Sequence, residues 1–215
     1  MKSIIFIAPP AAGKGTQSSF LESLGYVHIS TGDMLRSEIA SGSELGINIS
    51  DLISNGLLVS DDIVINLIEK KLKSIQGKPF ILDGFPRTMN QVLSLDEIFN
   101  KLNIINYVTI YLDLDMDIAL KRALGRLTCS CGKSYNLYFD ELKPKVDGIC
   151  DKCNNELIKR NDDNEESFKQ RFATYLKNTT PIIKFYEGKD ILVKVNANRD
   201  SDSISNDIKE IIKWL

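Results

Sequence analysis

Five short apolar runs, separated by stretches with helical periodicity, constrain the fold of this chain more than any other feature. The runs are rich in Ile, Val, Phe and Tyr, and they cover residues 4–8, 26–29, 80–82, 107–112 and 191–195. Continuous apolar runs of this length are typical of strands that are buried on both faces. The alternation therefore predicts an α/β fold with a five-stranded parallel sheet that is covered by helices on both faces.

Two of the helical stretches carry an apolar stripe that we assign to core packing. Their residues are Ile63, Val64, Leu67, Ile68 and Leu72 in one stretch, and Ile204, Ile208, Ile211, Ile212 and Leu215 in the other.

Two segments interrupt the alternation of strands and helices. Residues 30–60 are polar, helical in spacing and rich in Gly and Ser, including Gly56, whereas residues 127–164 have no helical period. We interpret both segments as insertions on the sheet.

Charge and terminal sequence exclude several classes of partner. The formal net charge is -2, so no long-range attraction to nucleic acid or to an anionic membrane is indicated. The N-terminal apolar run is too short to span a membrane and continues directly into Pro9 and Pro10 without a cleavage-type site. We therefore expect a cytoplasmic protein without a nucleic-acid or membrane partner. Because no large exposed apolar stripe stands out, we also expect a monomer.

A strand, a loop and a helix follow one another at the N-terminus. The loop reads Ala8-Pro9-Pro10-Ala11-Ala12-Gly13-Lys14-Gly15-Thr16-Gln17. Amides at a helix N-terminus bind anions, so this context predicts a phosphate-binding loop in which Lys14 reaches the β- and γ-phosphates of a nucleotide. If Ala11 needs a positive φ, its Cβ costs about 1 kcal/mol. A Gly-rich turn with an exposed lysine is the alternative.

Arginine is uncommon in this chain and therefore informative. Lysine and arginine total 27, and seven of these are arginine, at positions 36, 87, 122, 126, 160, 171 and 199. The planar guanidinium binds phosphate or carboxylate through two hydrogen bonds, which lysine cannot do. Arg122 and Arg126 lie four apart in a stretch of helical spacing, which predicts that both project from one helix face. A surface salt bridge is the alternative for any single arginine.

Further polar residues stand at the ends of predicted elements. Asp83 ends the third apolar run, and ligands of open α/β sheets bind at the carboxyl ends of strands, so Asp83 is placed to hold Mg²⁺ or its waters. A helix N-cap is its alternative. Asp162, Asp163 and Asn164 mark the start of a helix that carries Arg171. His28 matches no acid or base requirement, and we interpret it as structural.

All four cysteines lie within the second insertion. They form Cys129-Ser130-Cys131 and Cys150-Asp151-Lys152-Cys153. Four thiolates in a segment with few apolar residues suit a tetrahedral structural Zn²⁺, which would substitute for a core. Free thiols or an iron site are the alternatives.

Four motifs occur in order along the chain. They are Gly13-Lys14-Gly15-Thr16-Gln17 after two prolines, Ser30-Thr31-Gly32-Asp33-Met34-Leu35-Arg36, Asp83-Gly84-Phe85-Pro86-Arg87-Thr88 with Gln91, and Arg160-Asn161-Asp162-Asp163-Asn164-Glu165-Glu166 with Arg171. From end to end the chain thereby resembles the adenylate kinase family of nucleoside monophosphate kinases, in the long form with a zinc-type lid. The family loop usually reads Gly-Pro-Pro-Gly-Ala-Gly-Lys-Gly-Thr-Gln, so Ala8 and Ala11 depart from it. Family lids often have Cys-x-x-Cys in both halves, whereas the first half here is one residue shorter.

The resemblance implies a P-loop kinase fold with sites for two nucleotides. For ATP it implies Ala11, Ala12, Gly13, Lys14, Gly15, Thr16, Arg126, Ser134 and Tyr135, with the backbone near Arg199 against the donor base. For AMP it implies Thr31, Arg36, Leu57, Leu58, Val59, Gly84, Phe85, Pro86, Arg87, Gln91, Arg160 and Arg171, with Gln91 reading the adenine. The implied catalytic residues are Lys14, Asp83, Arg87, Arg122, Arg160 and Arg171.

The resemblance also implies the reaction and the domains. The reaction is reversible, Mg²⁺-dependent, in-line transfer of a phosphoryl group from ATP to AMP, giving two ADP. Residues 1–29, 60–126 and 165–215 would form the core, residues 30–59 a helical AMP-binding domain, and residues 127–164 a lid with the zinc site. Both insertions would close on the core and exclude water.

Three other readings remain open from the residues. Another nucleoside monophosphate kinase is the nearest, although the full-length lid and Gln91 disfavour it. A nucleotide-binding regulator with decayed catalysis would explain Ala8 and Ala11, but Lys14, Asp83 and the arginines are retained. A zinc ribbon for nucleic acid would need interleaved aromatic residues and a basic face, which the chain lacks.

Overall fold

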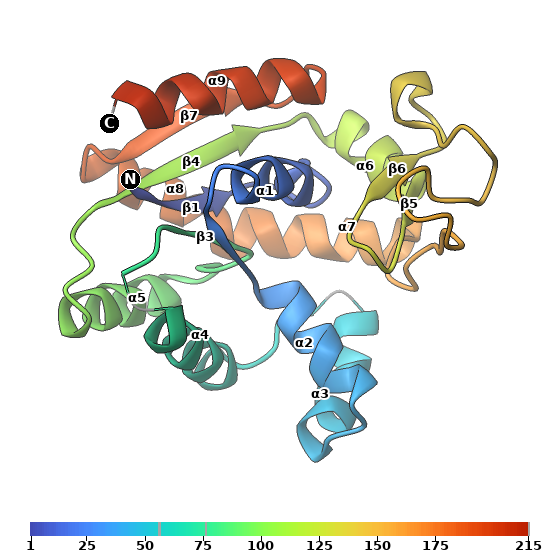
Figure 1. Ribbon diagram of the computed structural model, residues 1–215. Helices are drawn as coiled ribbons and strands as arrows, with labels where there is room; N and C mark the ends of the chain where they lie inside the picture. The colour runs from blue at the N-terminus through green and yellow to red at the C-terminus, as the bar shows by residue number, and fades with distance from the viewer. Residues whose placement is uncertain (56, 76, 215) are drawn as a thin grey trace.

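A five-stranded parallel sheet forms the centre of the computed structural model (Figure 1), which describes residues 1–55, 57–75 and 77–214. Gly56 and Leu215, two positions considered above, lie outside the described residues. The strand order is β2-β3-β1-β4-β7. The bounds are Ser3–Ile7 for β1, Val27–Ser30 for β2, Phe80–Asp83 for β3, Tyr107–Asp113 for β4 and Leu192–Asn196 for β7. The predicted parallel sheet is confirmed, with each strand at its expected apolar run.

The central strand β1 supplies side chains to both faces of the sheet. All five of its residues are buried. Ile5 and Ile7 belong to one core cluster, and Ile4 and Phe6 belong to the other. Successive strand residues point to opposite faces, so the strand is apolar from Ile4 to Ile7 because helices cover it on both sides.

Helices complete the two cores, as predicted. One cluster includes residues of α2 (Thr31–Ala40), α3 (Glu44–Ser54), α4 (Asp61–Ile75), α5 (Met89–Lys101) and α8 (Thr180–Gly188). The other includes residues of α1 (Lys14–Glu22), α6 (Met116–Leu124), α7 (Glu165–Thr174) and α9 (Ser201–Trp214). The predicted apolar stripes pack in these clusters through α4 and α9. None of the described helices combines the length and hydrophobicity needed to cross a membrane.

The two interrupting segments differ in structure. The first contains α2 and α3, and their N-caps are Ser30 and Ser43, whose hydroxyls accept from backbone amides. Gly46 allows the two helices to touch, since a Cβ there would lie 2.2 Å from the Glu38 carbonyl oxygen. The second contains the antiparallel strands β5 (Arg126–Thr128) and β6 (Ser134–Asn136) and the short 3-10 helix η1 (Asp140–Leu142). Figure 1 shows the second segment projecting beyond the ends of β4 and α7.

The predicted placement of Arg122 and Arg126 on one helix face is wrong. Helix α6 ends at Leu124, Gly125 is its C-cap, and Arg126 is the first residue of β5. Gly125 lies against β6, because a Cβ there would fall 2.4 Å from Asn136 Oδ1. The close approach of β6 thus ends the helix before its apolar spacing would.

The predicted helix start near Asn164 is confirmed. The Asn164 side chain accepts from the Ser167 amide and caps α7. The helical path continues from α7 through η2 (Tyr175–Thr179), a π-helical turn, into α8. This turn places the Thr179 hydroxyl 3.2 Å from the carbonyl oxygen of Arg87, to which it donates.

Candidate active site

The loop between β1 and α1 has the backbone that binding a phosphate requires. Helix α1 begins at Lys14, and Gly13 precedes it in the left-handed region with φ 86°. Ala11 has φ 60°, so the cost of about 1 kcal/mol that accompanies a Cβ in this conformation applies here. The amides at the start of α1 thus border the cavity described next.

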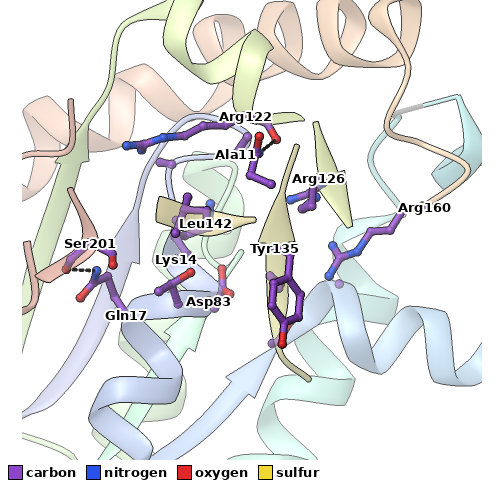
Figure 2. Close-up of a pocket in the computed structure, with 18 of the residues that line it drawn as sticks. Ala11, Lys14, Gln17, Asp83, Arg122, Arg126, Tyr135, Leu142, Arg160 and Ser201 are labelled. Carbon is purple, nitrogen blue, oxygen red and sulfur yellow. Dashed lines mark hydrogen bonds between the residues drawn. The ribbon is translucent and has the colours of Figure 1, made fainter. Parts of the chain in front are cut away.

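A cavity of about 250 Å³ opens beside this loop. Of the predicted ATP and catalytic residues, its lining contains Ala11, Ala12, Gly13, Lys14, Gly15, Thr16, Asp83, Arg87, Arg122, Arg126, Ser134, Tyr135, Arg160 and Arg171. These residues come from the carboxyl ends of β1 and β3 with the loops that follow them, from α6, from the cysteine-bearing segment and its borders, and from α7. Figure 2 shows Lys14 and Asp83 near the middle of the cavity, with Arg126, Tyr135 and Arg160 on one side.

Lys14 lies among other cations. Desolvation lowers the pKa of Lys14 to about 8, and the charges of Arg87, Arg171 and Arg126 act in the same direction, while Asp83 opposes them. Within the described part of the chain, Lys14 has no hydrogen bond or ion pair of its own. Its ammonium group is therefore free to bind an anion in the cavity.

Asp83 lies at the carboxyl end of β3, beside Lys14. Its Oδ2 is 3.3 Å from Nε2 of His28. Burial alone would raise the pKa of Asp83, but the contact with His28 and the charge of Lys14 hold it below its usual value. The carboxyl is therefore ionised at neutral pH. Asp83 does not cap the following helix, because the N-cap of α5 is Thr88. His28, which we interpreted as structural, lines the cavity.

Carboxylates pair with four of the seven arginines: Arg36 with Asp33, Arg199 with Asp207, and Arg126 and Arg171 with the two aspartates that precede α7. Arg126 Nε donates to Asp163 Oδ2 at 2.8 Å, with a second contact between the same two groups, and Asp163 is fully buried. Arg171 Nη1 donates to Asp162 Oδ2 at 2.8 Å. Sequence reasoning used the two aspartates to mark a helix start and missed that they fix the arginines.

The remaining three arginines form no ion pair among the described residues. Arg122 donates to the carbonyl oxygens of Ala197 and Arg199, at 2.9 and 3.0 Å. Arg87 Nε donates to the Gly84 carbonyl oxygen at 2.8 Å. Among the described residues, Arg160 has no carboxylate within ion-pair distance. The cavity therefore contains guanidinium groups whose donors are not all satisfied by the protein.

A second cavity, of about 80 Å³, adjoins the first. Of the predicted AMP residues, its lining contains Thr31, Arg36, Leu57, Leu58, Val59, Gly84, Arg87, Gln91 and Arg171. Gly32, Arg36, Arg87 and Arg171 line both cavities. The two cavities therefore meet at three guanidinium groups.

Some predicted residues lie elsewhere. Phe85 is fully buried in the first core cluster, and Pro86 lines a third cavity, of about 60 Å³. Arg160 lines the first cavity rather than the second. Arg199 lines neither, because its guanidinium pairs with Asp207, although the neighbouring Asp200 and Ser201 line the first.

The four cysteines gather at one point in the second insertion. Their Sγ atoms all lie within 4.8 Å of one another, with 3.3 Å between Cys129 and Cys153 and 3.7 Å between Cys131 and Cys150. Metal–sulfur bonds of about 2.3 Å in a tetrahedral site place the sulfurs about 3.8 Å apart. The four thiols thus fit one tetrahedral metal ion, and the small cluster around them consists mainly of Tyr135 and Leu157.

Comparison with known proteins decides the family. The family model described as adenylate kinase matches residues 6–191. The chain belongs to the adenylate kinase family. It is 41% identical over 213 residues to an adenylate kinase of Pseudothermotoga lettingae, covering 98% of this chain and 97% of that protein. It is 43% identical to one of Thermosipho melanesiensis, with 98% and 99% covered, and 42% identical to one of Borrelia turicatae, with 97% and 98% covered.

Adenylate kinases are phosphotransferases, and the cavities supply groups that sequence reasoning about the family motifs did not find. The first cavity is also lined by Gln17, His28, Asn136, Phe139, Leu142, Asp200 and Ser201. Gln17 carried a signal, because it ends the loop motif, and its Nε2 donates to the Ser201 carbonyl oxygen at 3.1 Å (Figure 2). Phe139 and Leu142 come from an irregular segment without periodicity, so no pattern pointed to them.

The ion pair between Arg126 and Asp163 generates a stability prediction for this member of the adenylate kinase family. In Asp163→Asn, the largely buried guanidinium of Arg126 loses its counter-charge, and we expect the free energy of unfolding to fall by about 2 kcal/mol. Urea denaturation at pH 7 measures the change. The control is Asp140→Asn, which breaks an exposed ion pair with Lys143 and should cause no measurable change. Equal stability of the wild-type protein and Asp163→Asn would contradict this account.

Proposed function

We propose that the protein transfers the γ-phosphoryl group of ATP to AMP, reversibly and with Mg²⁺, giving two ADP. The observation that carries this proposal is the junction of the two cavities at Arg36, Arg87 and Arg171. A donor in the first cavity and an acceptor in the second would direct their phosphates toward the same guanidinium groups. The adenine nucleotides themselves are inferred from the relatives, which are named adenylate kinases.

In the proposed step, an oxygen of the AMP phosphate attacks the γ-phosphorus in line. The new P–O bond forms as the bond to the oxygen bridging the β- and γ-phosphates breaks, and ADP leaves with that electron pair. The attacking oxygen is already anionic, so the step needs no general base. Catalysis then consists of positioning and neutralisation of charge, for which Lys14, Arg87, Arg122, Arg160 and Arg171 are arranged around the cavity.

Asp83 is the residue that would hold the Mg²⁺ accompanying ATP, directly or through water. Asp83 suits Mg²⁺ because its ionised carboxylate is a hard oxygen ligand, the kind that Mg²⁺ prefers. The side chain also lines the cavity proposed for ATP. The cation, when bound, supplies neutralisation of phosphate charge. The amides of Gly13, Lys14, Gly15 and Thr16 would bind the phosphates from the other side.

We propose that the two bases occupy the outer parts of the cavities. On the acceptor side, Leu35, Leu57, Val59 and Val64 provide apolar surface, and Gln91 provides hydrogen bonds. On the donor side, Ser134 and Tyr135 of β6 line the cavity, and the Arg199 backbone is close to it through Asp200. An apolar slot with few polar groups is the usual form of a base-binding site.

Closure of two domains is part of the proposal. Residues 30–59 would be the AMP-binding domain and residues 127–164 the lid, while residues 1–29, 60–126 and 165–215 would form the core. Arg126 and Arg160 lie near the borders of the lid segment and line the cavity, so its movement would bring them to or from the phosphates. Closure would exclude water, which could otherwise accept the phosphoryl group.

We propose Zn²⁺ as the ion for Cys129, Cys131, Cys150 and Cys153. Four thiolates with this spread of sulfur atoms favour a structural tetrahedral ion with no open position. The segment has a small apolar cluster, so the ion would supply cross-links that a core otherwise provides. We also propose that the protein acts as a cytoplasmic monomer without nucleic-acid partners. The net charge of -2 supports the last of these points, because it provides no general attraction to polyanions.

The substrate assignment is tested by a coupled assay of ADP formation with Mg²⁺, ATP and each of AMP, UMP, CMP and GMP. We expect kcat/KM to be highest for AMP, by at least about tenfold, because Gln91 lies in the acceptor cavity. Turnover no faster with AMP than with the other monophosphates would overturn the assignment and favour another nucleoside monophosphate kinase. Nucleotide binding without turnover would favour a regulator.

Metal removal tests the zinc site. Protein purified without chelator should contain about one zinc per chain by elemental analysis. A strong chelator should lower the melting temperature by roughly 5–10 °C, because the cross-link of the lid segment is lost, while turnover persists below the transition. Cys150→Ser should reproduce the loss and Ser130→Ala should not. Absence of zinc from the purified protein would rule out this site.

The pKa of Lys14 generates a pH prediction. Because this pKa is lowered to about 8, the ammonium group loses its proton in the free enzyme as the pH rises through that value. If protonated Lys14 binds the phosphates, kcat/KM for ATP falls above about pH 8, approaching tenfold per pH unit. Initial rates at saturating AMP between pH 7 and 9.5 measure this. A constant kcat/KM across the range would contradict the role of Lys14.

A further inference from the structure

Asp61, the first residue of α4, contacts the acceptor cavity through Gln91. Gln91 is buried, with 2% of its surface exposed. Its Nε2 donates to Asp61 Oδ1 at 2.6 Å, and its Oε1 accepts from the backbone N–H of Arg87 at 2.7 Å. Asp61 itself does not belong to the lining of the cavity. Any influence of Asp61 on a ligand must therefore pass through the Gln91 amide.

These two partners allow one orientation of the amide. An ionised carboxylate can only accept, so the atom of Gln91 that faces Asp61 must be the nitrogen. A backbone N–H can only donate, so the atom that faces Arg87 must be the oxygen. Rotating the amide by 180° would set oxygen against carboxylate and NH₂ against N–H, and both contacts would be repulsive.

The fixed orientation leaves one donor and one acceptor for a ligand. Nε2 retains a second hydrogen, and Oε1 retains a second lone pair. This pair is complementary to adenine, where N1 accepts and the 6-amino group donates. A 6-oxopurine presents the reverse pattern, because its N1 carries a hydrogen and its O6 accepts. It would pair only with the rotated amide.

We propose that Asp61 is a specificity-determining residue of the acceptor site, which selects 6-aminopurine over 6-oxopurine monophosphates by fixing the orientation of the Gln91 amide. Asp61 acts as a positioning residue rather than as a ligand of the base. The inference rests on the proposed function, in which Gln91 reads the acceptor base.

Asp61 is itself well fixed. Its Oδ2 accepts from Thr88 Oγ1 at 2.9 Å and from Asn90 Nδ2 at 3.0 Å. Thr88 in turn caps α5 by accepting from the backbone N–H of Gln91 at 3.2 Å. Asp61 also lies in the first turn of α4, where the helix dipole stabilises a carboxylate. One carboxylate oxygen is thus occupied by Thr88 and Asn90, and the other faces Gln91.

The experiment compares AMP with inosine monophosphate, which differs from AMP at N1 and at the 6-position. The variant is Asp61→Asn, whose side-chain amide can donate as well as accept and so can pair with Gln91 in either orientation. We expect the ratio of kcat/KM for AMP to that for inosine monophosphate to fall at least about tenfold, since the hydrogen bond to a charged group no longer opposes rotation and only the Arg87 backbone N–H still does. The matched control is Asn90→Ala, which removes another bond to Asp61 without freeing the Gln91 amide and should leave the ratio unchanged.

A structural role alone would lower kcat/KM for both monophosphates in parallel, and an unchanged ratio in Asp61→Asn would overturn the inference. If Asp61→Asn does not fold, Asp61→Ala tests the same ratio, because it removes the acceptor altogether. Gln91→Leu separates this failure from that of the proposed function. If Gln91→Leu abolishes the preference for AMP and the Asp61 variants do not change it, the inference alone fails. If the wild-type protein does not phosphorylate AMP, both fail.

Discussion

Crowding of positive charge around Lys14 is the constraint on which the site depends. Seven cationic side chains and four acidic ones line the larger cavity, whereas the whole chain has a net charge of -2. Two like charges 4 Å apart repel by about 4 kcal/mol at the effective dielectric of a protein surface. Asp83, Asp162 and Asp163 offset part of this repulsion through contacts with or near Lys14, Arg126 and Arg171. The uncompensated charge that remains is complementary to polyphosphate.

The fold brings these charges together from distant parts of the chain. The carboxyl ends of the parallel strands β1 and β3 supply the phosphate loop and Asp83, and they are neighbours in the sheet. Helix α7 supplies Arg171, and the borders of the cysteine-bearing segment supply Arg126 and Arg160. Because two cores fix the sheet from both faces, the phosphate loop and Asp83 stand on its carboxyl end. The arginines at the segment borders are the part that closure would adjust.

The fold could be predicted because the sequence signals for its strands and helices are local. Parts of the site could not be predicted, because they depend on contacts between residues that are distant in the sequence. Uninterrupted apolar runs define the five strands, and the loop motif places Lys14 at the start of α1. Gly125, directly after Leu124, is a local signal for the end of α6, but the reason that only glycine fits there is the approach of Asn136 from a different strand. Pairing of Asp163 with Arg126 and of Asp61 with Gln91 spans 37 and 30 residues, respectively. No spacing rule connects such residues, so only the folded chain shows that these carboxylates orient the functional groups.

The central claim is that one guanidinium serves both nucleotides at the junction of the cavities. Arg171 lines both and is held there by Asp162. The most direct measurement is calorimetric titration of Arg171→Met with AMP and, separately, with a non-hydrolysable ATP analogue. The account predicts that both affinities fall at least about tenfold relative to the wild-type protein, the effect of removing a charged hydrogen bond. Loss of affinity for one nucleotide with full retention of the other would contradict it.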